Sequence, residues 1–321
     1  MESGRVALAG LLGRCAAIVR LKREVAQLGP SEMWVHVFGE TGTGKEMVAR
    51  ALHDLSPRSR RPFVPFNAAG FTDELLMAEL FGHARGAFTG AVAAREGYVA
   101  KAEGGTLFVD EVAELSPTAQ ARLLRFLQER EYQRIGETAT RTADVRVVSA
   151  TNVDLARRVA EGRFRQDLWY RLKTDRLAVP PLRDRGDDIL LLARHFLRAR
   201  AAEGGTAAAL LSPAVEDALL RHPWPGNVRE LGNEAHRLAV RAAGREATLD
   251  DLSADVLPDP GRAPAGGLRA ALQHCEAELV RRALERHGGI LARAAAELGI
   301  TRQALWVKVR RLGLVGVGVG G

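Results

Sequence analysis

The chain has 321 residues, of which 46% are hydrophobic and 26% are charged, so it is long enough for two or three globular domains. Its formal net charge of +7 favours an anionic partner but indicates no particular fold. No apolar run approaches the about 20 residues of a membrane-spanning helix, and the first residues lack the pattern of a signal peptide. Cys15 and Cys275 are the two cysteines and are far apart. We therefore expect reduced thiols in a cytoplasmic protein with no membrane partner.

Short apolar runs alternate with helical patterns through the first two thirds of the sequence. The runs at 33–38, 106–110 and 145–152 are rich in β-branched and other apolar residues, which is typical of buried parallel strands. Helices are predicted after Gly44 and from Ser116-Pro117, which has the N-cap and first-turn proline of a helix start. This order predicts an α/β fold with a doubly wound parallel sheet.

The pattern changes after Pro180-Pro181, where only helical periodicity continues as far as about residue 241. A Pro/Gly-rich segment at 257–267 then predicts a linker, and the glycine-rich last residues predict a disordered tail. The predicted divisions are an N-terminal extension (1–12), an α/β core (13–180), a helical lid (181–250), a linker (251–267), a basic helical domain (268–314) and a tail (315–321).

A phosphate-binding loop is predicted between the first strand and the helix that follows it. The sequence GETGTGKE has the G-x-x-x-x-G-K pattern in the strand–loop–helix context that the motif requires. Its glycines let backbone N–H groups face phosphate oxygens, and the helix N-terminus adds its dipole. Lys45 is expected to reach the β- and γ-phosphates of ATP, whereas Glu46 replaces the usual Ser/Thr, so other groups must hold Mg²⁺. The predicted ATP contacts here are Gly39, Glu40, Thr41, Gly42, Thr43, Gly44, Lys45 and Glu46.

Two adjacent carboxylates end the strand predicted at 106–110. Asp110 is predicted to hold Mg²⁺, directly or through water, and Glu111 to polarise the attacking water. Taken alone, the pair is more typical of an acidic strand end at the surface. Together with the phosphate loop, it indicates ATP hydrolysis rather than nucleotide binding alone.

Five motifs together resemble the AAA+ activators of sigma-54 RNA polymerase, also called bacterial enhancer-binding proteins. In family order over about residues 13–250 they are GETGTGKE, ELFGHARGAFTGA, GGTLFVDEV, FRQDLWYRL and WPGNVREL. GAFTGA is the most specific, because other AAA+ branches lack it. The resemblance implies that this loop contacts sigma-54, with Phe88 and Thr89 as the contact surface and glycines that give the backbone freedom to move. Its residues are Gly86, Ala87, Phe88, Thr89, Gly90 and Ala91.

The resemblance also implies nucleotide-dependent roles for residues outside the phosphate loop. Asn67 matches the asparagine that couples the catalytic glutamate to the nucleotide state, although alone it would be a turn residue. Thr151 and Asn152 match the sensor I region, which places Asn152 near ATP.

Three arginines match family positions as well. Arg165 and Arg171 match the arginines that reach a neighbour's ATP, and Arg229 matches sensor II in the lid. A neighbour's arginine explains oligomer-dependent hydrolysis, because charge developing on phosphate is met only across an interface. The resemblance implies a hexamer in the active state and a dimer at rest. Without the motifs, surface ion pairs would explain Arg165 and Arg171, and Arg229 would be a solvated charge in the first turn of a helix that Asn227 caps.

The segment 290–313 has the pattern of a helix-turn-helix and resembles the Fis-type DNA-binding domain of the same family. Gly299 suits the left-handed residue that ends the first helix, and Thr301 can cap the second. Ala294 and Ala295 allow close packing. Early residues of the second helix are expected at bases and later basic residues at phosphates, whereas a basic helical cap without a ligand is the alternative. The predicted DNA contacts are Thr301, Arg302, Gln303, Trp306, Lys308, Arg310 and Arg311.

The sequence departs from the family pattern at a few positions. Ala68 replaces a common cysteine. Ile290 replaces an asparagine that would cap a helix, and the loss of this cap should cost about 1 kcal/mol of stability. Only about a dozen residues precede the AAA+ match, where most relatives carry a sensory domain. We therefore expect no sensory domain and regulation in trans, by expression level, or not at all.

The leading functional hypothesis is an ATP-hydrolysing transcription activator with ATP and Mg²⁺ as cofactors. It would bind upstream, enhancer-like DNA and remodel the closed complex of sigma-54 and its RNA polymerase. The alternatives are a nucleotide-sensing DNA-binding regulator that uses neither hydrolysis nor sigma-54, and another AAA+ machine such as a helicase loader or chelatase subunit. Glu111, the two arginines and the intact 86–91 loop favour the first hypothesis.

Overall fold

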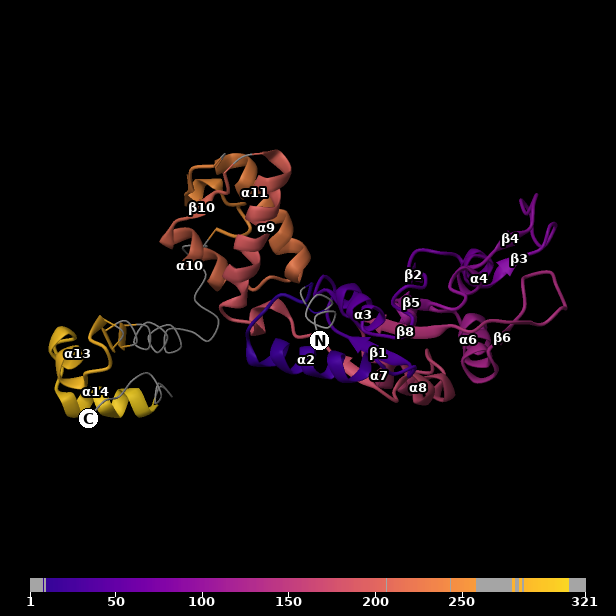
Figure 1. Ribbon diagram of the computed structural model, residues 1–321, viewed down its shortest axis with the longest axis horizontal. Coiled ribbons are helices and arrows are strands. Elements are labelled where there is room, and N and C mark those ends of the chain that lie inside the picture. The colour runs from indigo at the N-terminus through magenta and orange to yellow at the C-terminus, as the bar shows by residue number, and fades with distance from the viewer. Residues whose placement is uncertain are drawn as a thin grey trace. The chain divides into compact units, whose positions relative to one another are not determined.

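The computed structural model describes residues 8, 10–205, 207–242, 244–257, 279–280, 283–284 and 286–311. The chain divides into two compact units, Met1–Leu257 and Pro258–Gly321, which we describe separately (Figure 1). Most of the predicted N-terminal extension, the linker from residue 258 onward and the 315–321 tail lie outside the described residues.

A five-stranded parallel sheet forms the centre of the first unit, in the order β2-β5-β8-β1-β9. All six residues of β8 are buried, because helices cover both faces of the sheet, and this explains the lack of polar alternation in the sequence. The parallel α/β core predicted from the apolar runs is confirmed. The strands are β1 (Val35–Phe38), β2 (Phe63–Asn67), β5 (Thr106–Asp110), β8 (Arg146–Thr151) and β9 (Arg176–Ala178).

Alternate residues of the central strands enter two separate hydrophobic clusters, one on each face of the sheet. Val147 packs in one cluster, and Val148 packs in the other. Ser116 caps α6 as predicted, since its Oγ accepts a hydrogen bond from the Ala119 N–H at 3.1 Å. The helices around the sheet are α2 (Ala16–Leu28), α3 (Lys45–Asp54), α4 (Asp73–Phe81), α5 (Tyr98–Lys101), α6 (Pro117–Glu129), α7 (Leu155–Ala160) and α8 (Gln166–Leu172), with the 3-10 turn η1 (Val112–Glu114) after β5.

A buried cation lies at the start of β8. The Arg146 side chain is 0% exposed and donates to the carbonyls of Leu28, Gly29, Met33 and Leu52 at 2.9–3.2 Å. Three of these carbonyls lie at or near the C-terminal ends of α2 and α3, where the helix dipoles favour a positive charge. Burial lowers the pKa of this guanidinium.

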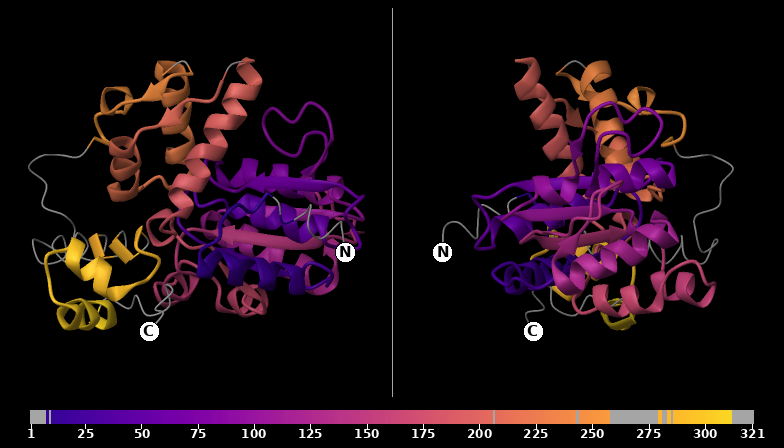
Figure 2. Two further views of the ribbon diagram at one scale, coloured as in Figure 1. Left: turned by 60° about the vertical axis from the view of Figure 1, so that its left-hand side comes forward. Right: turned by 90° about the vertical axis from the view of Figure 1, so that its right-hand side faces the viewer.

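Two hairpins, β3 (Gly82–His83) with β4 (Arg95–Glu96) and β6 (Glu131–Tyr132) with β7 (Arg141–Thr142), extend from the core (Figures 1 and 2). They are joined at their bases, since the Ala84 N–H donates to the Ile135 carbonyl at 2.9 Å and the Ile135 N–H to the Gly82 carbonyl at 2.8 Å. The 86–91 loop lies within the first hairpin.

The helical lid follows the core through η2 (Leu182–Asp184) and packs around the fully buried Trp224. Its other elements are α9 (Asp188–Gly204), β10 (Leu210–Leu211), α10 (Pro213–Arg221), α11 (Asn227–Ala242), β11 (Glu246–Ala247) and η3 (Leu249–Asp251). Leu252 and Val256 are buried in this cluster, and the Glu234 carboxylate accepts from the Ser253 N–H at 2.7 Å. The lid therefore extends past residue 250, where the sequence placed the start of a linker.

The lid also binds the N-terminal segment of the core. Asp188, the first residue of α9, accepts hydrogen bonds from the backbone N–H groups of Arg14 at 2.6 Å and Cys15 at 3.1 Å. Cys15 precedes α2, so a lid carboxylate satisfies the N-terminus of a core helix. A side chain on Gly13 would overlap this carboxylate, at 2.6 Å from Asp188 Oδ2.

The second unit contains α13 (Leu291–Glu297) and α14 (Arg302–Arg311). Ala294 and Ala295 are buried, Gly299 has a φ of +65°, and Thr301 Oγ1 accepts from the Ala304 N–H at 3.2 Å. These features confirm the predicted helix–turn–helix pattern. In the parts of the chain that the structure describes, no helix is long and apolar enough to cross a membrane.

Candidate functional site

The predicted phosphate loop, residues 39–44, runs from β1 into α3. Gly42 and Gly44 adopt left-handed φ values of +78° and +98°, which residues with a Cβ rarely adopt. Lys45 is buried at the start of α3, and its Nζ donates to the Gly39 carbonyl at 3.0 Å. Thr43 is buried as well, with its hydroxyl bonded to the Glu40 carbonyl at 2.8 Å. Hydrogen bonds within the loop therefore hold it folded around the Lys45 side chain.

The two carboxylates at the end of β5 lie beside this loop. Glu111 Oε1 lies 3.6 Å from Lys45 Nζ, and Asp110 Oδ1 accepts from the Glu111 N–H at 3.0 Å. Glu111 has a φ of +53°, a conformation that costs a non-glycine residue about 1 kcal/mol. This backbone places the carboxylate beside Lys45 and the Asn152 N–H, which lies 3.4 Å from Glu111 Oε2.

Residues from neighbouring strand ends complete this edge of the sheet. The Asn152 carboxamide follows β8 and donates to Thr41 Oγ1 at 2.9 Å, so the residue predicted to belong to sensor I contacts the phosphate loop. Asn67 pairs in register with Asp110, but its Oδ1 accepts from the Ala69 N–H at 2.8 Å and forms a local turn. Among the described residues, no hydrogen bond joins Asn67 to Glu111.

Glu46, a predicted ATP contact, pairs with a residue of its own helix. Its carboxylate forms an ion pair with Arg50, one turn later on α3, with both side chains about half exposed and 3.0 Å between NH2 and Oε1. The expectation that other groups hold Mg²⁺ stays a prediction.

Lid residues that the sequence did not assign to the site hold the phosphate loop in place. Arg183 binds the Glu40 carboxylate through two bonds of 2.6 and 2.8 Å. Hydrogen bonds from Arg183 and then Asn227 lower the pKa of Glu40. The guanidinium of Arg185, only 4% exposed, donates to the Thr43 carbonyl at 3.0 Å. No spacing signal in the sequence links these lid residues to the loop.

Asn227 does not cap α11 with its side chain as the sequence predicted. At the start of this helix the Glu230 carboxylate instead accepts a hydrogen bond from the Gly226 N–H at 2.6 Å. Arg229, the predicted sensor II residue, has an exposed side chain, and its N–H donates to the Gly42 carbonyl at 3.2 Å. The lid therefore contacts the loop through backbone as well as side chains.

The two arginines predicted to act on a neighbour lie away from this loop. Arg165 directly precedes α8 and forms two bonds of 3.0 and 2.7 Å to Asp167, with about half of its side chain exposed. The Arg171 guanidinium lies 4.4 Å from the centre of the Trp34 ring. Within one chain, Arg165 thus forms the surface ion pair that was its alternative explanation.

The 86–91 loop is closed by a bond of 2.8 Å from the Gly86 N–H to the Ala91 carbonyl. Gly86 and Gly90 have φ values of +76° and +101°, and no atom lies within 4 Å of either Cβ position, so their backbone conformation rather than crowding favours glycine. Thr89 is exposed. Phe88 is half-buried, edge-on against His83 with 5.0 Å between ring centres, so it is less exposed than a free contact residue would be.

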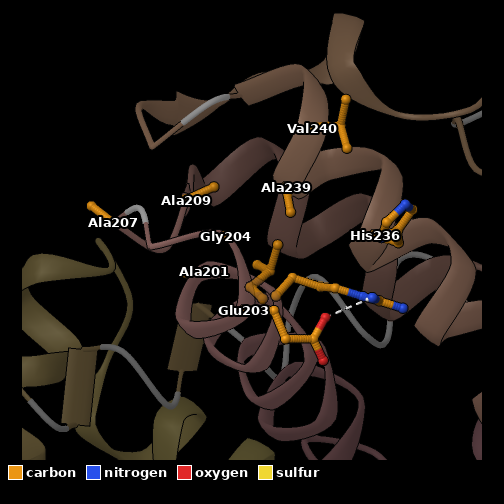
Figure 3. Close-up of a pocket in the computed structure, with 10 residues that line it drawn as sticks. Ala201, Glu203, Gly204, Ala207, Ala209, His236, Ala239 and Val240 are labelled. Carbon is orange, nitrogen blue, oxygen red and sulfur yellow. Dashed lines mark hydrogen bonds and ion pairs between the residues drawn. The ribbon is translucent and has the colours of Figure 1, made fainter.

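A groove of about 360 Å³ lies on the lid between α9 and α11 (Figure 3). Ala201, Gly204 and Ala239 form part of its small-residue lining, and His236 lies at one side. None of the residues predicted to bind nucleotide lines this groove, so it is separate from the phosphate loop.

The predicted DNA-contacting residues lie on α14 and the turn before it. Leu305 and Val309 are buried against α13, whereas Arg302, Gln303 and Trp306 lie on the exposed face. Lys308 is half-buried. Arg310 and Arg311 lie in the last turn of the helix, where the described residues end.

Comparison with known proteins accounts for nearly the whole chain. Residues 11–178 match the Sigma-54 interaction domain, residues 183–266 the AAA+ ATPase lid domain, and residues 271–312 the bacterial regulatory proteins of the Fis family.

Individual relatives span most of the chain as well. The transcriptional regulatory protein ZraR of Salmonella typhimurium is 44% identical over 311 residues, which cover 97% of this chain and 70% of ZraR. The C4-dicarboxylate transport transcriptional regulatory protein DctD of Pseudomonas aeruginosa is 45% identical over 304 residues, or 95% of this chain and 64% of DctD. The crystal structure of NtrX from Brucella abortus in complex with ATP has a TM-score of 0.71 and 34% identity, and the match covers 94% of this chain and 69% of NtrX.

These similarities confirm the family, the fold and the ATPase class expected from the motifs. The matched domains follow the order of the α/β core, the lid and the helix-turn-helix. The chain belongs to the sigma-54-dependent transcriptional activators, with an AAA+ ATPase domain that interacts with sigma-54 and a Fis-type DNA-binding domain.

Proposed function

We propose that this activator hydrolyses ATP between the subunits of a homo-oligomer and uses the 86–91 loop to remodel the closed complex of sigma-54 RNA polymerase. The observation that carries the proposal is the 3.6 Å approach of Glu111 to Lys45 beside a closed phosphate loop. A cation for the phosphates and a carboxylate for the attacking water then lie on one edge of the sheet.

Each group at this edge has a role in the proposed reaction. Lys45 binds the β- and γ-phosphates of ATP, and Glu111 orients and polarises the water that attacks the γ-phosphate. The Asp110 carboxylate and the Thr43 hydroxyl are oxygen ligands of the kind Mg²⁺ prefers, so the residues present fit this ion. Bound Mg²⁺ would offset negative charge on the phosphate oxygens. Asn152, bonded to Thr41, and Arg229, in the first turn of α11, contact the nucleotide from the two sides of the loop.

The oligomer supplies the remaining positive charge. Arg165 and Arg171 reach the ATP of a neighbouring subunit in a hexamer, which forms from a resting dimer. Their position on the exposed side of α8 and beside it supports this proposal, as does a groove of about 450 Å³ that Arg165, Asp167 and Tyr170 help to line. Arg165 must leave Asp167 to act on a neighbour, so assembly and release of this ion pair occur together. ATPase activity should rise steeply with protein concentration, and a flat, low activity would contradict unaided assembly.

The Fis-type domain holds the oligomer near the promoter by binding upstream DNA. Arg302, Gln303 and Trp306 contact bases from the exposed face of α14, while Thr301, Lys308, Arg310 and Arg311 contact phosphates. Because phosphate contacts release counterions, binding should weaken steeply with salt.

Open-complex formation at a sigma-54 promoter in vitro tests the proposal. We expect the wild-type protein to open the promoter only with hydrolysable ATP, Lys45→Ala to lose nucleotide binding, and Glu111→Gln to bind ATP but fail to turn it over. Glu129→Gln is the matched control, because Glu129 is exposed and ion-paired on the surface. Promoter opening without hydrolysis, or normal turnover in Glu111→Gln, would refute the proposal. Nucleotide and DNA binding by a wild-type protein that neither hydrolyses ATP nor opens the promoter would favour a nucleotide-sensing regulator.

A further inference from the structure

Asn227 is the first residue of α11 and lies where the lid, the core and the phosphate loop meet. It is 0% exposed and has a φ of +54°, in the left-handed region that asparagine tolerates better than most residues. A polar side chain that is fully buried requires partners for its donors and its acceptor. The identity of those partners shows what the side chain does.

The carboxamide of Asn227 joins three segments that are distant in sequence. Its Oδ1 accepts from the Leu182 N–H at 2.8 Å, where the chain enters the lid. Its Nδ2 donates to the Thr41 carbonyl at 3.0 Å and to Glu40 Oε2 at 3.1 Å, both in the phosphate loop. A third acceptor, the Pro225 carbonyl, lies at 3.4 Å within the lid turn itself.

These partners fix the orientation of the amide. The Leu182 N–H can only donate, and the Thr41 carbonyl can only accept, so exchanging Oδ1 and Nδ2 would face donor against donor and acceptor against acceptor. No other side chain of similar size supplies one acceptor and two donors in this arrangement.

The bond to the Thr41 carbonyl orients the phosphate loop. In a trans peptide the C=O and the following N–H point in opposite directions. With the Thr41 carbonyl held toward Asn227, the Gly42 N–H faces away from the lid, toward the inner side of the loop. Inward-facing N–H groups are what such a loop uses to bind phosphate oxygens.

The next peptide is held in the same way. The Gly42 carbonyl accepts from the Arg229 N–H at 3.2 Å, so the Thr43 N–H faces away from the lid, and it donates to the Glu40 carbonyl across the loop at 3.3 Å. Lid and loop are in close backbone contact here, since a Cβ on Gly42 would lie 2.3 Å from the Gly226 carbonyl oxygen. Glu40 adds a third link through Arg183.

We propose that Asn227 is a positioning residue that holds the phosphate loop in its phosphate-binding form when the lid is docked. The side chain does not itself contact ATP. It acts through the Thr41–Gly42 peptide and Glu40, so nucleotide affinity depends on lid docking. The inference rests on the proposed binding of ATP at this loop, which the wild-type protein tests separately.

Two substitutions of Asn227 separate hydrogen bonding from shape. Asn227→Gly suits the left-handed backbone and removes the amide, while Asn227→Asp keeps the shape and the acceptor for Leu182 but turns a carboxylate toward Glu40 and the Thr41 carbonyl. Asn233→Asp is the matched control, because Asn233 is exposed on the same helix. The full chain is titrated with a fluorescent ATP analogue, and steady-state ATP hydrolysis, thermal unfolding and amide exchange of the 40–44 segment are measured.

We expect Asn227→Gly to weaken ATP binding about tenfold and Asn227→Asp to weaken it further, because each loses bonds to the loop and only the aspartate adds repulsion. KM should rise while kcat at saturating ATP stays within about twofold, because bound nucleotide then orders the loop. Amide exchange of the 40–44 segment should accelerate in both variants, and Asn233→Asp should match the wild type.

Several outcomes would overturn the inference. Asn227→Gly that folds and binds ATP within about twofold of wild type would show that the amide does not position the loop. A loss of kcat at unchanged KM would indicate a general structural defect. A larger loss of ATP affinity in Asn227→Gly than in Asn227→Asp would indicate the same. If Asn227→Asp does not fold, Asn227→Gly decides alone. Failure of the wild-type protein to bind ATP would instead refute the proposed function.

Discussion

Gly136, in the loop between β6 and β7, packs directly against Ala87 of the 86–91 loop. A Cβ on Gly136 would lie 2.9 Å from the Ala87 Cβ and 3.2 Å from its Cα, so the two hairpin loops are in contact beyond their joined bases. The conformation of one loop therefore constrains the other.

Gly136→Ala should impair promoter opening more than ATP hydrolysis or DNA binding, because the added methyl group displaces Ala87. Gly205→Ala is the matched control: Gly205 also has a positive φ, but no atom lies within 4 Å of its Cβ position. Both variants should lose about 1 kcal/mol of stability from backbone strain, measured by urea unfolding. Equal promoter opening by the two variants would show that the Gly136–Ala87 contact is unimportant.

Thr89→Ala should keep ATP hydrolysis and DNA binding yet fail to open sigma-54 promoters. Thr89 is exposed and lies between the two left-handed glycine positions of its loop, so its loss should not disturb packing. The measurements are ATPase rate, DNA affinity and open-complex formation on one preparation, with Thr138→Ala, an exposed threonine in the other hairpin, as control. A loss of ATPase activity alone would make the loop a folding element.

Stability should fall as the pH drops from about 6.5 toward 4, in part because of one histidine. His36 is buried on β1 with Nδ1 2.9 Å from Ser149 Oγ, and burial, then Arg176, lower its pKa to about 4. The unfolded chain binds a proton below about pH 6.5 while the native chain does not, so the stability present at neutral pH is lost on acidification.

His36→Gln should reduce this pH dependence by about 2 kcal/mol between about pH 7.5 and pH 5. Urea unfolding at both pH values gives the difference directly, and any constant cost of the substitution cancels. His195→Gln, at an exposed position, should leave the dependence unchanged. A His36→Gln protein as acid-sensitive as the wild type would show that His36 does not contribute.

Arg146→Met should destabilise the first unit by more than about 3 kcal/mol, since it removes the side-chain donor from the buried carbonyls of Gly29 and Leu52. Arg163→Met, at a largely exposed position, should change stability by less than about 0.5 kcal/mol. Urea unfolding followed by circular dichroism measures both. Similar stabilities would mean that water or a backbone shift replaces the guanidinium.

Local signals allowed much of the fold to be predicted from the sequence. The start of α3 after Gly44, the cap of α6 at Ser116 and the left-handed Gly299 each depend on the backbone needs of a few neighbouring residues. The edge that bears Asp110 and Glu111 was predictable because the ends of parallel strands meet at one edge of a sheet.

Long-range partners were not predictable in the same way. Asn227 begins a helix, so the local sequence predicts that its side chain caps that helix. Its buried amide instead donates to Glu40, which is 187 residues away. Arg183 likewise binds Glu40 across 143 residues. Phe88 was expected at a contact surface, yet a ring on the neighbouring strand half-buries it.

The hydrogen bonds of Asp188 at the start of α2 link the segment before this helix directly to the lid. The hydrogen bonds from the Arg14 and Cys15 N–H groups end on the first residue of α9, whereas Leu11 packs in the hydrophobic cluster of the sheet, so this segment is held by both the lid and the core. The lid in turn touches the phosphate loop through Arg229. A displacement of this segment would therefore reach the phosphate loop through the lid as well as through the core.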